Sequence, residues 1–192
     1  MKKPIVIKAC PCSGTRYISA YLNKAGYRVG HESYQIGGMV GYPATPIKFD
    51  LEQVIVGHQV RHPIRVIESS HTFTGSVAWK RMCAFVRVSE SWLAKNDLQS
   101  LMMIWVLWNE LADESCSFTY RVEDQLHILN EHLPKPLPEE GPSITTNTHR
   151  LGRDGKPTGK VPDLTMDMLE EASPEWAARL RDLALKYGYG LS

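Results

Sequence analysis

The chain has 192 residues, with 22 Lys or Arg against 21 Asp or Glu, so its net charge is +1. This length fits one domain, expected to span residues 1–192, and a hydrophobic fraction of 43% excludes wholesale disorder. The near-neutral charge excludes the broad positive field of a non-specific nucleic-acid binder, so no nucleic-acid partner is expected. Any anion site must be local, built from a few cations and backbone amides.

The four cysteines are too few for a disulfide-stapled secreted scaffold. Cys10 and Cys12 have no second pair at ligand spacing, which favours free thiols and predicts no metal. Lys8 interrupts the first apolar run too early for a signal sequence. The longest apolar stretch, residues 101–108, is far shorter than the roughly 20 residues that span a membrane. We expect a cytoplasmic protein with no membrane partner.

The first 31 residues predict a βαβ unit. Residues 4–9 form a short apolar, β-branched run typical of a buried strand. Residues 16–25 repeat apolar side chains at helical spacing, and Gly26 is a natural residue to follow the helix end. Residues 27–31 indicate a second strand. Together they favour an α/β fold with a mainly parallel sheet flanked by helices.

The remaining elements continue this alternation. A long loop is expected over residues 33–50, a third strand over 53–60 and a helix over 64–73. The strongest helix pattern covers 98–112, followed by a fourth strand over 117–122 and a helix over 123–133. Six prolines between residues 134 and 162 predict a long surface loop, and two helices over 164–171 and 174–187 end the chain.

The turn between the first strand and helix has the composition of a phosphate or sulfate site. It reads Pro11-Cys12-Ser13-Gly14-Thr15, with a glycine for close backbone approach and two hydroxyls as donors. The following helix end adds exposed N–H groups and a positive dipole. The turn lacks the Gly-Lys-Ser/Thr of a Walker A loop, which disfavours an ATPase. Capping of the helix alone would also explain these residues.

A second anion-binding element follows the third strand. Arg61 stands at the strand end, and Ser69 lies eight residues later, about two helical turns on. Ligands of parallel α/β sheets collect outside the carboxyl ends of the strands. A guanidinium there can hold a phosphate through two N–H groups, and the serine hydroxyl can reach the same anion. A surface arginine beside a helix-starting proline is the plain alternative.

The two elements, in this order and at this separation, resemble those of PAPS-dependent sulfotransferases, including the small bacterial and viral types. The resemblance covers about residues 4–160 and implies their P-loop kinase-like fold. Residues 22–32, Trp105-x-x-Trp108-Asn109 and Arg121-Val122-Glu123-Asp124 are similar to further segments of that family. The implied activity is transfer of a sulfuryl group from PAPS, the co-substrate, to a hydroxyl or amine of a small-molecule or glycan acceptor.

The resemblance also implies roles for individual residues. The turn Pro11, Cys12, Ser13, Gly14 and Thr15 would hold the 5′-phosphosulfate, and Arg61 with Ser69 would bind the 3′-phosphate. A late basic loop closes over the nucleotide in many members. Residues 147–160 are similar in character, with four cations, Arg150, Arg153, Lys156 and Lys160. A solvated loop is the alternative for this segment.

One position departs from the family pattern. Many members carry Lys or Arg between the proline and the serine of the turn, where this chain has Cys12. The basic residue neutralises charge on the bridging oxygen as the sulfuryl group leaves. We hypothesise that Arg16, in the first turn of the helix, supplies this charge, and Lys8 is the weaker candidate.

Two residues at the end of the second strand are candidates for the catalytic base. Some sulfotransferases carry a catalytic glutamate there, and this chain has His31 and Glu32. Either could accept the proton of the acceptor, or Glu32 could only orient Arg16. His58, His62 and His71 also flank the predicted cleft; His62 is interpreted as a loop residue beside Arg61, and His71 is a minor candidate.

Two other functions are compatible with the pattern. A nucleotide kinase of related fold would need a lysine in the turn and Mg²⁺-binding carboxylates, and the lysine is absent. A domain that binds PAPS or its product but transfers slowly or not at all would fit the Cys12 departure.

Overall fold

The structure, a computed structural model, describes residues 3–41, 52–70, 83–84, 86, 98–143 and 163–191. They belong to two compact units, one of residues 1–61 with 109–144 and the other of residues 62–108 with 145–192. These are called unit 1 and unit 2. In the described part of the chain, no helix is both long and apolar enough to cross a membrane.

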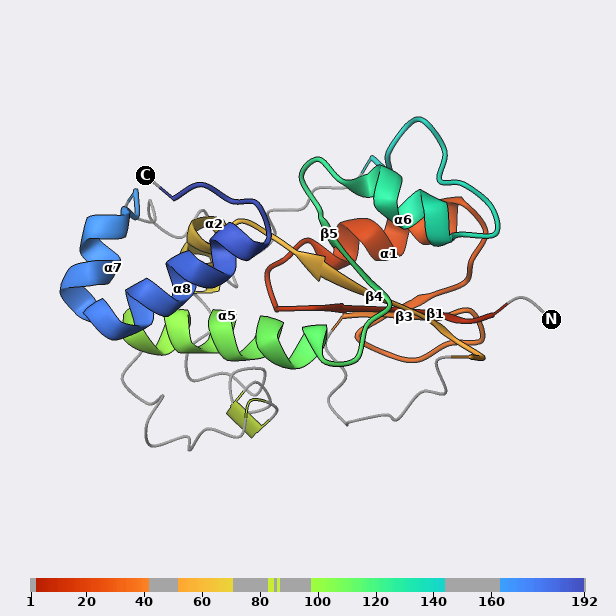
Figure 1. Cartoon of the computed structure of the whole chain (residues 1–192). Coiled ribbons are helices and arrows are strands. Elements are labelled where there is room, and N and C mark those ends of the chain that lie inside the picture. Colours follow the sequence, from red (N-terminus) through yellow and green to blue (C-terminus); the bar gives the residue numbers. More distant parts are fainter. Residues whose placement is uncertain are drawn as a thin grey trace, which may run out of the picture. The chain divides into compact units, whose positions relative to one another are not determined.

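Unit 1 contains a five-stranded parallel sheet (Figure 1). The spatial order is β2-β3-β1-β4-β5, with every neighbouring pair parallel. The α/β prediction with a mainly parallel sheet is therefore confirmed. The strands are β1 (Ile5–Ala9), β2 (Gly30–His31), β3 (Gly38–Gly41), β4 (Ile55–Val60) and β5 (Phe118–Arg121).

The predicted strand–turn–helix opening is confirmed. β1 is buried along most of its length, as its apolar run requires. Helix α1 (Thr15–Lys24) follows and buries Ile18 and Leu22 on the face turned to the sheet. Gly26 then adopts a φ of 89°, a left-handed conformation that suits glycine after a helix end.

The expectation of a loop throughout residues 33–50 is wrong, because β3 forms within it. β3 lies between β2 and β1 and pairs Met39 with Val6. Its sequence, Gly-Met-Val-Gly, is too short and too rich in glycine to show a strand pattern. Gly38 explains the composition: its φ is 116°, and an added Cβ would lie 1.8 Å from the Ile5 carbonyl oxygen. Only glycine allows β3 to approach β1 here.

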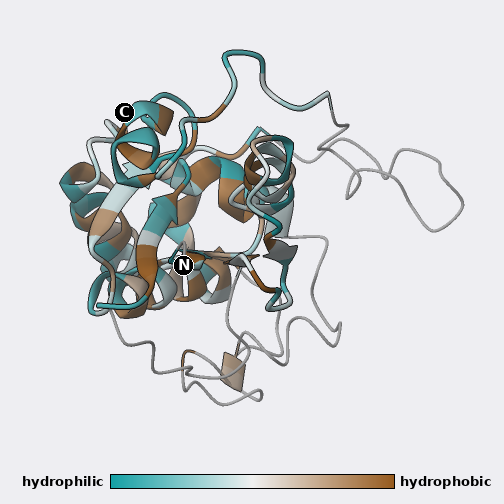
Figure 2. Ribbon diagram, turned by 90° about the vertical axis from the view of Figure 1, so that its right-hand side faces the viewer, coloured by the Kyte–Doolittle hydropathy of each residue, from teal (hydrophilic) through white to brown (hydrophobic). Residues whose placement is uncertain are grey.

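The sheet of unit 1 has two different faces. One packs against α1 and helix α6 (Leu126–His132) through residues such as Ile7, Leu22 and Leu129. The opposite face carries Val6, Met39 and Val56, with Cys116 packed against them. The helices show hydrophobic and hydrophilic residues in alternation along their ribbons (Figure 2), as expected for helices with one buried side.

The described part of the expected proline-rich surface loop is packed on α1. Residues 134–143 contain no helix or strand, yet Leu137 is buried in the same core as α1. The Tyr21 hydroxyl donates to the Pro138 carbonyl, and the Lys24 ammonium donates to the Glu140 carbonyl at 3.1 Å. Polar side chains of α1 thus donate hydrogen bonds to backbone carbonyls of a segment that pairs with no strand. Residues 144–162 lie outside the described part.

The described elements of unit 2 are helical. They comprise α2 (Pro63–Ser70), the first part of α5 (Leu98–Asp113), α7 (Met166–Ala172) and α8 (Pro174–Lys186). The Trp105 and Tyr187 rings meet edge to face with centroids 6.3 Å apart, which ties α5 to the end of α8. The backbone N–H of Leu164 donates to Glu68 on α2 at 3.3 Å. These helices agree with the predicted ones to within a few residues.

Candidate functional site

The turn between β1 and α1 has a backbone suited to binding an anion. Cys12 has a φ of 65° and Gly14 a φ of 83°, with Ser13 between them outside the positive-φ region. The Ser13 N–H donates to the Cys10 carbonyl at 3.1 Å, which closes the turn. Turns with this alternation direct successive N–H groups into a concavity where anions bind.

No capping side chain or acidic residue of α1 itself competes with an anion at the amino end of this helix. Gly14 is its N-cap residue and makes no side-chain cap, and the first turn contains no acidic residue. The N–H groups of a first helical turn lack intrahelical acceptors, and the helix dipole adds a partial positive charge. The exposed Arg16 adds a full positive charge in the same turn.

Ser13 brings a buried hydroxyl to this turn. Its side chain is 0% exposed, and its Oγ has no hydrogen-bond partner among the described residues. A buried hydroxyl without a partner costs roughly 1–3 kcal/mol. A phosphate or sulfate oxygen held by the turn would satisfy it, so the donor set fits an anionic group.

Two side chains from the end of β4 hold the turn in place. The Arg61 guanidinium donates to the Cys12 carbonyl at 2.6 Å, and the buried Gln59 amide donates to the Ser13 carbonyl. Gln59 is itself fixed by the Tyr120 hydroxyl, which donates to its Oε1 at 2.8 Å. In a trans peptide the carbonyl and the next N–H point in opposite directions. The Gly14 N–H therefore points away from Gln59.

A second group of polar residues joins the turn from β2. The Thr15 hydroxyl lies 3.0 Å from His31 Nε2, and a Glu32 carboxylate oxygen lies 3.6 Å from the same nitrogen. Burial lowers the pKa of His31 and the Arg16 charge lowers it further, while Glu32 opposes them. The net shift is downward, so His31 is neutral near pH 7 and able to accept a proton.

Cys10, directly before the turn, is not an activated nucleophile. The four cysteines, all within the described residues, form no disulfide. Burial raises the pKa of the Cys10 thiol well above its usual value, and nearby Cys12 raises it further. A thiol held in its protonated form does not attack a substrate at neutral pH.

The structure brings together most, but not all, of the predicted site residues. Pro11 to Arg16, His31, Glu32 and Arg61 all belong to the surroundings of the turn in unit 1. Ser69 belongs to unit 2, where its hydroxyl donates to the Arg65 carbonyl at 2.8 Å within α2. The pairing of Arg61 with Ser69 stays a prediction. Arg150, Arg153 and His71 lie outside the described residues.

Sequence reasoning missed the residues behind the turn. Gln59 and Tyr120 are 0% exposed and are register partners on β4 and β5, so their side chains share one face of the sheet. A glutamine inside a strand run that is apolar apart from His58 was the available signal for Gln59. Nothing local marked Tyr120. His58, expected to flank the cleft, is instead fully buried and bonded to Asn109 and Asp113.

Comparisons with protein-family models, with curated proteins and with solved structures find no match for this chain. Its function must therefore be argued from the site itself. The site combines backbone donors, a buried hydroxyl, two arginines and a neutral imidazole. Such a set can bind an anionic group and accept a proton beside it.

Proposed function

We propose that the chain is a PAPS-dependent sulfotransferase with the P-loop kinase-like fold of that family. It would transfer a sulfuryl group to a hydroxyl or amine of a small-molecule or glycan acceptor and release adenosine 3′,5′-bisphosphate. The contact that carries the proposal is the one between Arg61 and the Cys12 carbonyl. It joins the two segments, far apart in sequence, whose resemblance to sulfotransferase phosphate-binding elements suggested the activity.

The nucleotide would lie across the ends of β1 and β4. The N–H groups of Gly14 and Thr15 and the Ser13 hydroxyl would hold its 5′ end, at the dipole of α1. Arg61 would bind the 3′-phosphate, and the contribution of Ser69 to this site stays a prediction from the sequence. The bond to Cys12 occupies one of the five N–H groups of a guanidinium, and the others can hold a phosphate.

The strand order supports a ligand at this place. β3 pairs with one edge of β1 and β4 pairs with the other edge. The connection from β3 to β4 therefore carries the chain from one side of β1 to the other. Ligands of open parallel sheets bind at such a switch, outside the carboxyl ends of the strands. Both the turn after β1 and Arg61 after β4 lie at carboxyl ends.

The transfer would proceed by in-line displacement. The acceptor oxygen or nitrogen attacks sulfur, the bond from sulfur to the bridging oxygen breaks, and the bisphosphate leaves with that oxygen. His31 or Glu32 takes the acceptor proton. His31 is suited to this because its lowered pKa keeps it neutral, and Glu32 at 3.6 Å stabilises the imidazolium that forms.

Arg16 would stabilise the leaving group in place of the basic residue that Cys12 replaces. Its charge already acts on His31, so it lies near both the turn and the proposed base. A fixed cation at a developing negative charge is an effective source of rate enhancement because it needs no reorganisation during the reaction.

Two alternatives remain proposals beside this one. If Arg16 does not replace the missing basic residue, the chain binds the nucleotide without appreciable transfer. A nucleotide kinase would require a lysine in the turn, and the segment from Cys10 to Arg16 contains none.

The experiment that tests the proposal is a transfer assay with sulfur-labelled PAPS. A panel of phenols, sugars and amines serves as acceptors, and bisphosphate release is measured in parallel. The expected result is labelled product and bisphosphate in equal amounts. Nucleotide binding without product would support the non-catalytic alternative, and binding of ATP in preference to the bisphosphate would support the kinase.

A further inference from the structure

A row of polar residues crosses the sheet face opposite α1. Lys8 on β1, His58 on β4 and Thr119 on β5 are register partners, so their side chains lie on the same face. That face is otherwise apolar, with Val6 and Val56 in its core. His58 is 0% exposed. Buried polar side chains in an apolar layer require specific partners.

Both ring nitrogens of His58 face oxygen atoms from the last turn of α5. Nδ1 lies 2.7 Å from Asp113 Oδ1, and Nε2 lies 2.9 Å from Asn109 Oδ1. A neutral imidazole carries one N–H, so it cannot donate to both oxygens. Three arrangements resolve this: a second proton on the ring, an Asn109 amide that presents its nitrogen, or a cation at Nδ1 in place of the proton.

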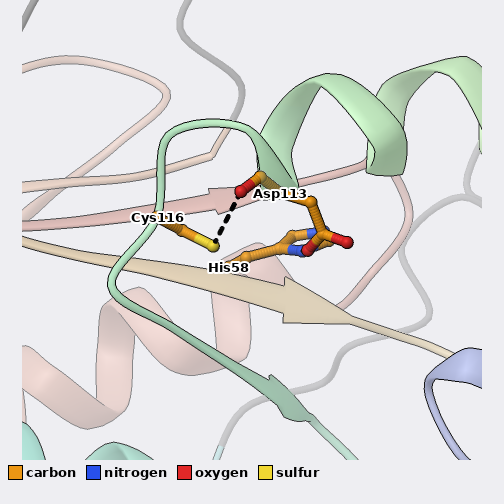
Figure 3. A group of neighbouring side chains, drawn as sticks. All are labelled: His58, Asp113 and Cys116. Atoms are coloured by element: carbon orange, nitrogen blue, oxygen red, sulfur yellow. Dashed lines mark hydrogen bonds and ion pairs between the residues drawn. The ribbon is translucent and has the colours of Figure 1, made fainter.

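Cys116 adds a potential sulfur ligand for the third arrangement, in which a cation is bound at Nδ1. An ordinary His–Asp pair lacks such a ligand. A ring nitrogen of His58, a carboxylate oxygen of Asp113 and Cys116 Sγ all lie within 4.8 Å of one another (Figure 3). Thr119 Oγ1 donates to Asp113 Oδ1 at 3.2 Å and lies 3.6 Å from the sulfur. This is the only such group of three potential ligands in the described residues.

One nitrogen, one oxygen and one sulfur are ligands that Zn²⁺ and Co²⁺ accept, at distances of about 2.0–2.3 Å. Three such ligands leave a fourth tetrahedral position for water. The bond from Nε2 to Asn109 is the kind of outer contact that orients a metal-binding histidine. Thr119 provides a similar contact to the carboxylate.

We propose that His58, Asp113 and Cys116 form a binding site for a divalent transition metal. The proposal departs from the sequence-based expectation of no metal, which considered only Cys10 and Cys12. Binding releases the proton of the Cys116 thiol to solvent, and His58 binds through the lone pair of Nδ1 while its one N–H lies on Nε2, toward Asn109. The metal then lies between a thiolate, a carboxylate and a neutral imidazole, and the His58–Asp113 contact lengthens to admit it.

The charge of the Lys8 ammonium opposes metal binding at this site. Its ammonium donates to the carbonyl of Ser115, the residue before Cys116, at 3.2 Å. A positive charge at this position repels a second cation. Replacing it with an uncharged side chain of similar length, Lys8→Met, is therefore expected to tighten metal binding.

The test is a titration of the full chain with Co²⁺, followed by absorption spectroscopy. One equivalent is expected to produce a thiolate-to-cobalt charge-transfer band and the intense visible bands of a tetrahedral site, both removed by excess Zn²⁺. Cys116→Ser is expected to abolish the charge-transfer band, and Asp113→Asn to weaken affinity roughly tenfold or more. These two positions are only partly buried, so both variants should fold. Circular dichroism checks this.

Cys12→Ser is the matched control because it removes the thiol of a different, partly buried cysteine. Its cobalt spectrum is expected to equal that of the unchanged chain. The proposal is overturned if no band forms at one equivalent, if the band survives Cys116→Ser, or if it disappears in Cys12→Ser instead. Sulfuryl transfer needs no metal, so none of these outcomes bears on the sulfotransferase proposal.

Discussion

The Arg61 guanidinium donates a hydrogen bond to the Cys12 carbonyl, 2.6 Å away, and thereby joins the end of β4 to the turn after β1. Gln59, two residues earlier, holds the next carbonyl of the same turn. Both bonds go to carbonyl oxygens, so they leave backbone N–H groups of the turn for a ligand. The end of β4 thus both supports the turn and contributes a cation beside it.

Removing the Tyr120 hydroxyl should destabilise the protein. Tyr120→Phe keeps the ring but leaves the buried Gln59 Oε1 without the donor 2.8 Å away. The expected loss is about 1–3 kcal/mol in the free energy of unfolding, measured by urea denaturation. Tyr34→Phe is the control, because Tyr34 is 49% exposed and should change stability little. Equal stability of the two variants would show that Gln59 does not depend on Tyr120.

Two glycines allow backbone strain to be separated from steric crowding. Gly26 and Gly38 both have positive φ, but an added Cβ at Gly26 meets nothing within 4 Å, whereas at Gly38 it would lie 1.8 Å from Ile5 O. Gly26→Ala should cost about 1–2 kcal/mol from strain alone. Gly38→Ala should cost roughly 1–3 kcal/mol more, because β3 must move from β1. Similar unfolding free energies would contradict the packing of β3 described above.

The environment of His31 predicts how its titration responds to its neighbours. Burial and Arg16 lower its pKa below the ordinary 6.5, and Glu32 raises it. Arg16→Ala should therefore shift the NMR titration midpoint of His31 upward, and Glu32→Gln should shift it downward. His31→Gln identifies the resonance. Shifts in the opposite directions would contradict the arrangement around Thr15.

The same lowered pKa fixes the sign of a stability effect. Between the folded pKa and 6.5 the unfolded chain binds more protons than the folded one, so stability rises with pH in that window. The contribution of His31 is complete above 6.5 and is lost as the pH falls through the folded pKa. In His31→Gln, the free energy of unfolding should depend less on pH in this window. An unchanged dependence on pH would contradict the lowered pKa of His31.

Arg16→Ala should depress turnover more than nucleotide affinity. If Arg16 stabilises the leaving group, its interaction strengthens only in the transition state, so kcat falls while the Kd for the bisphosphate changes little. Lys24→Ala is the control, because Lys24 is a cation at the other end of α1. Equal losses in kcat and affinity would make Arg16 a binding residue only.

Much of the fold could be predicted because its signals are local. The apolar run of β1, the glycine-containing turn and the helical spacing of α1 each depend on a few consecutive residues. β3 could not be predicted, because four residues with two glycines carry no periodic pattern. Its formation depends on pairing with Ile5 to Lys8, which lie more than thirty residues away.

Part of the candidate site could be predicted for the same reason, because its signals are local. The residues of the turn and Arg61 could be identified by their residue types and by their positions at strand ends. The support from Gln59 and Tyr120, and the group of His58, Asp113 and Cys116, arise only when strands distant in sequence become neighbours. The loop over residues 134–143 was predicted from its prolines, and the described residues form no helix or strand, but the prolines do not indicate that Leu137 is buried in the core with α1.

Calorimetry with adenosine 3′,5′-bisphosphate, 5′-AMP and ATP tests the central claim most directly. The chain should bind the bisphosphate in preference to both others, and Arg61→Ala should remove roughly 1.5–3 kcal/mol of that affinity while leaving 5′-AMP binding less affected. Arg65→Ala, at an arginine whose side chain is 64% exposed on α2, should leave all three unchanged. Equal binding of bisphosphate and 5′-AMP, or an Arg61→Ala variant with full affinity, would contradict a nucleotide held across the ends of β1 and β4.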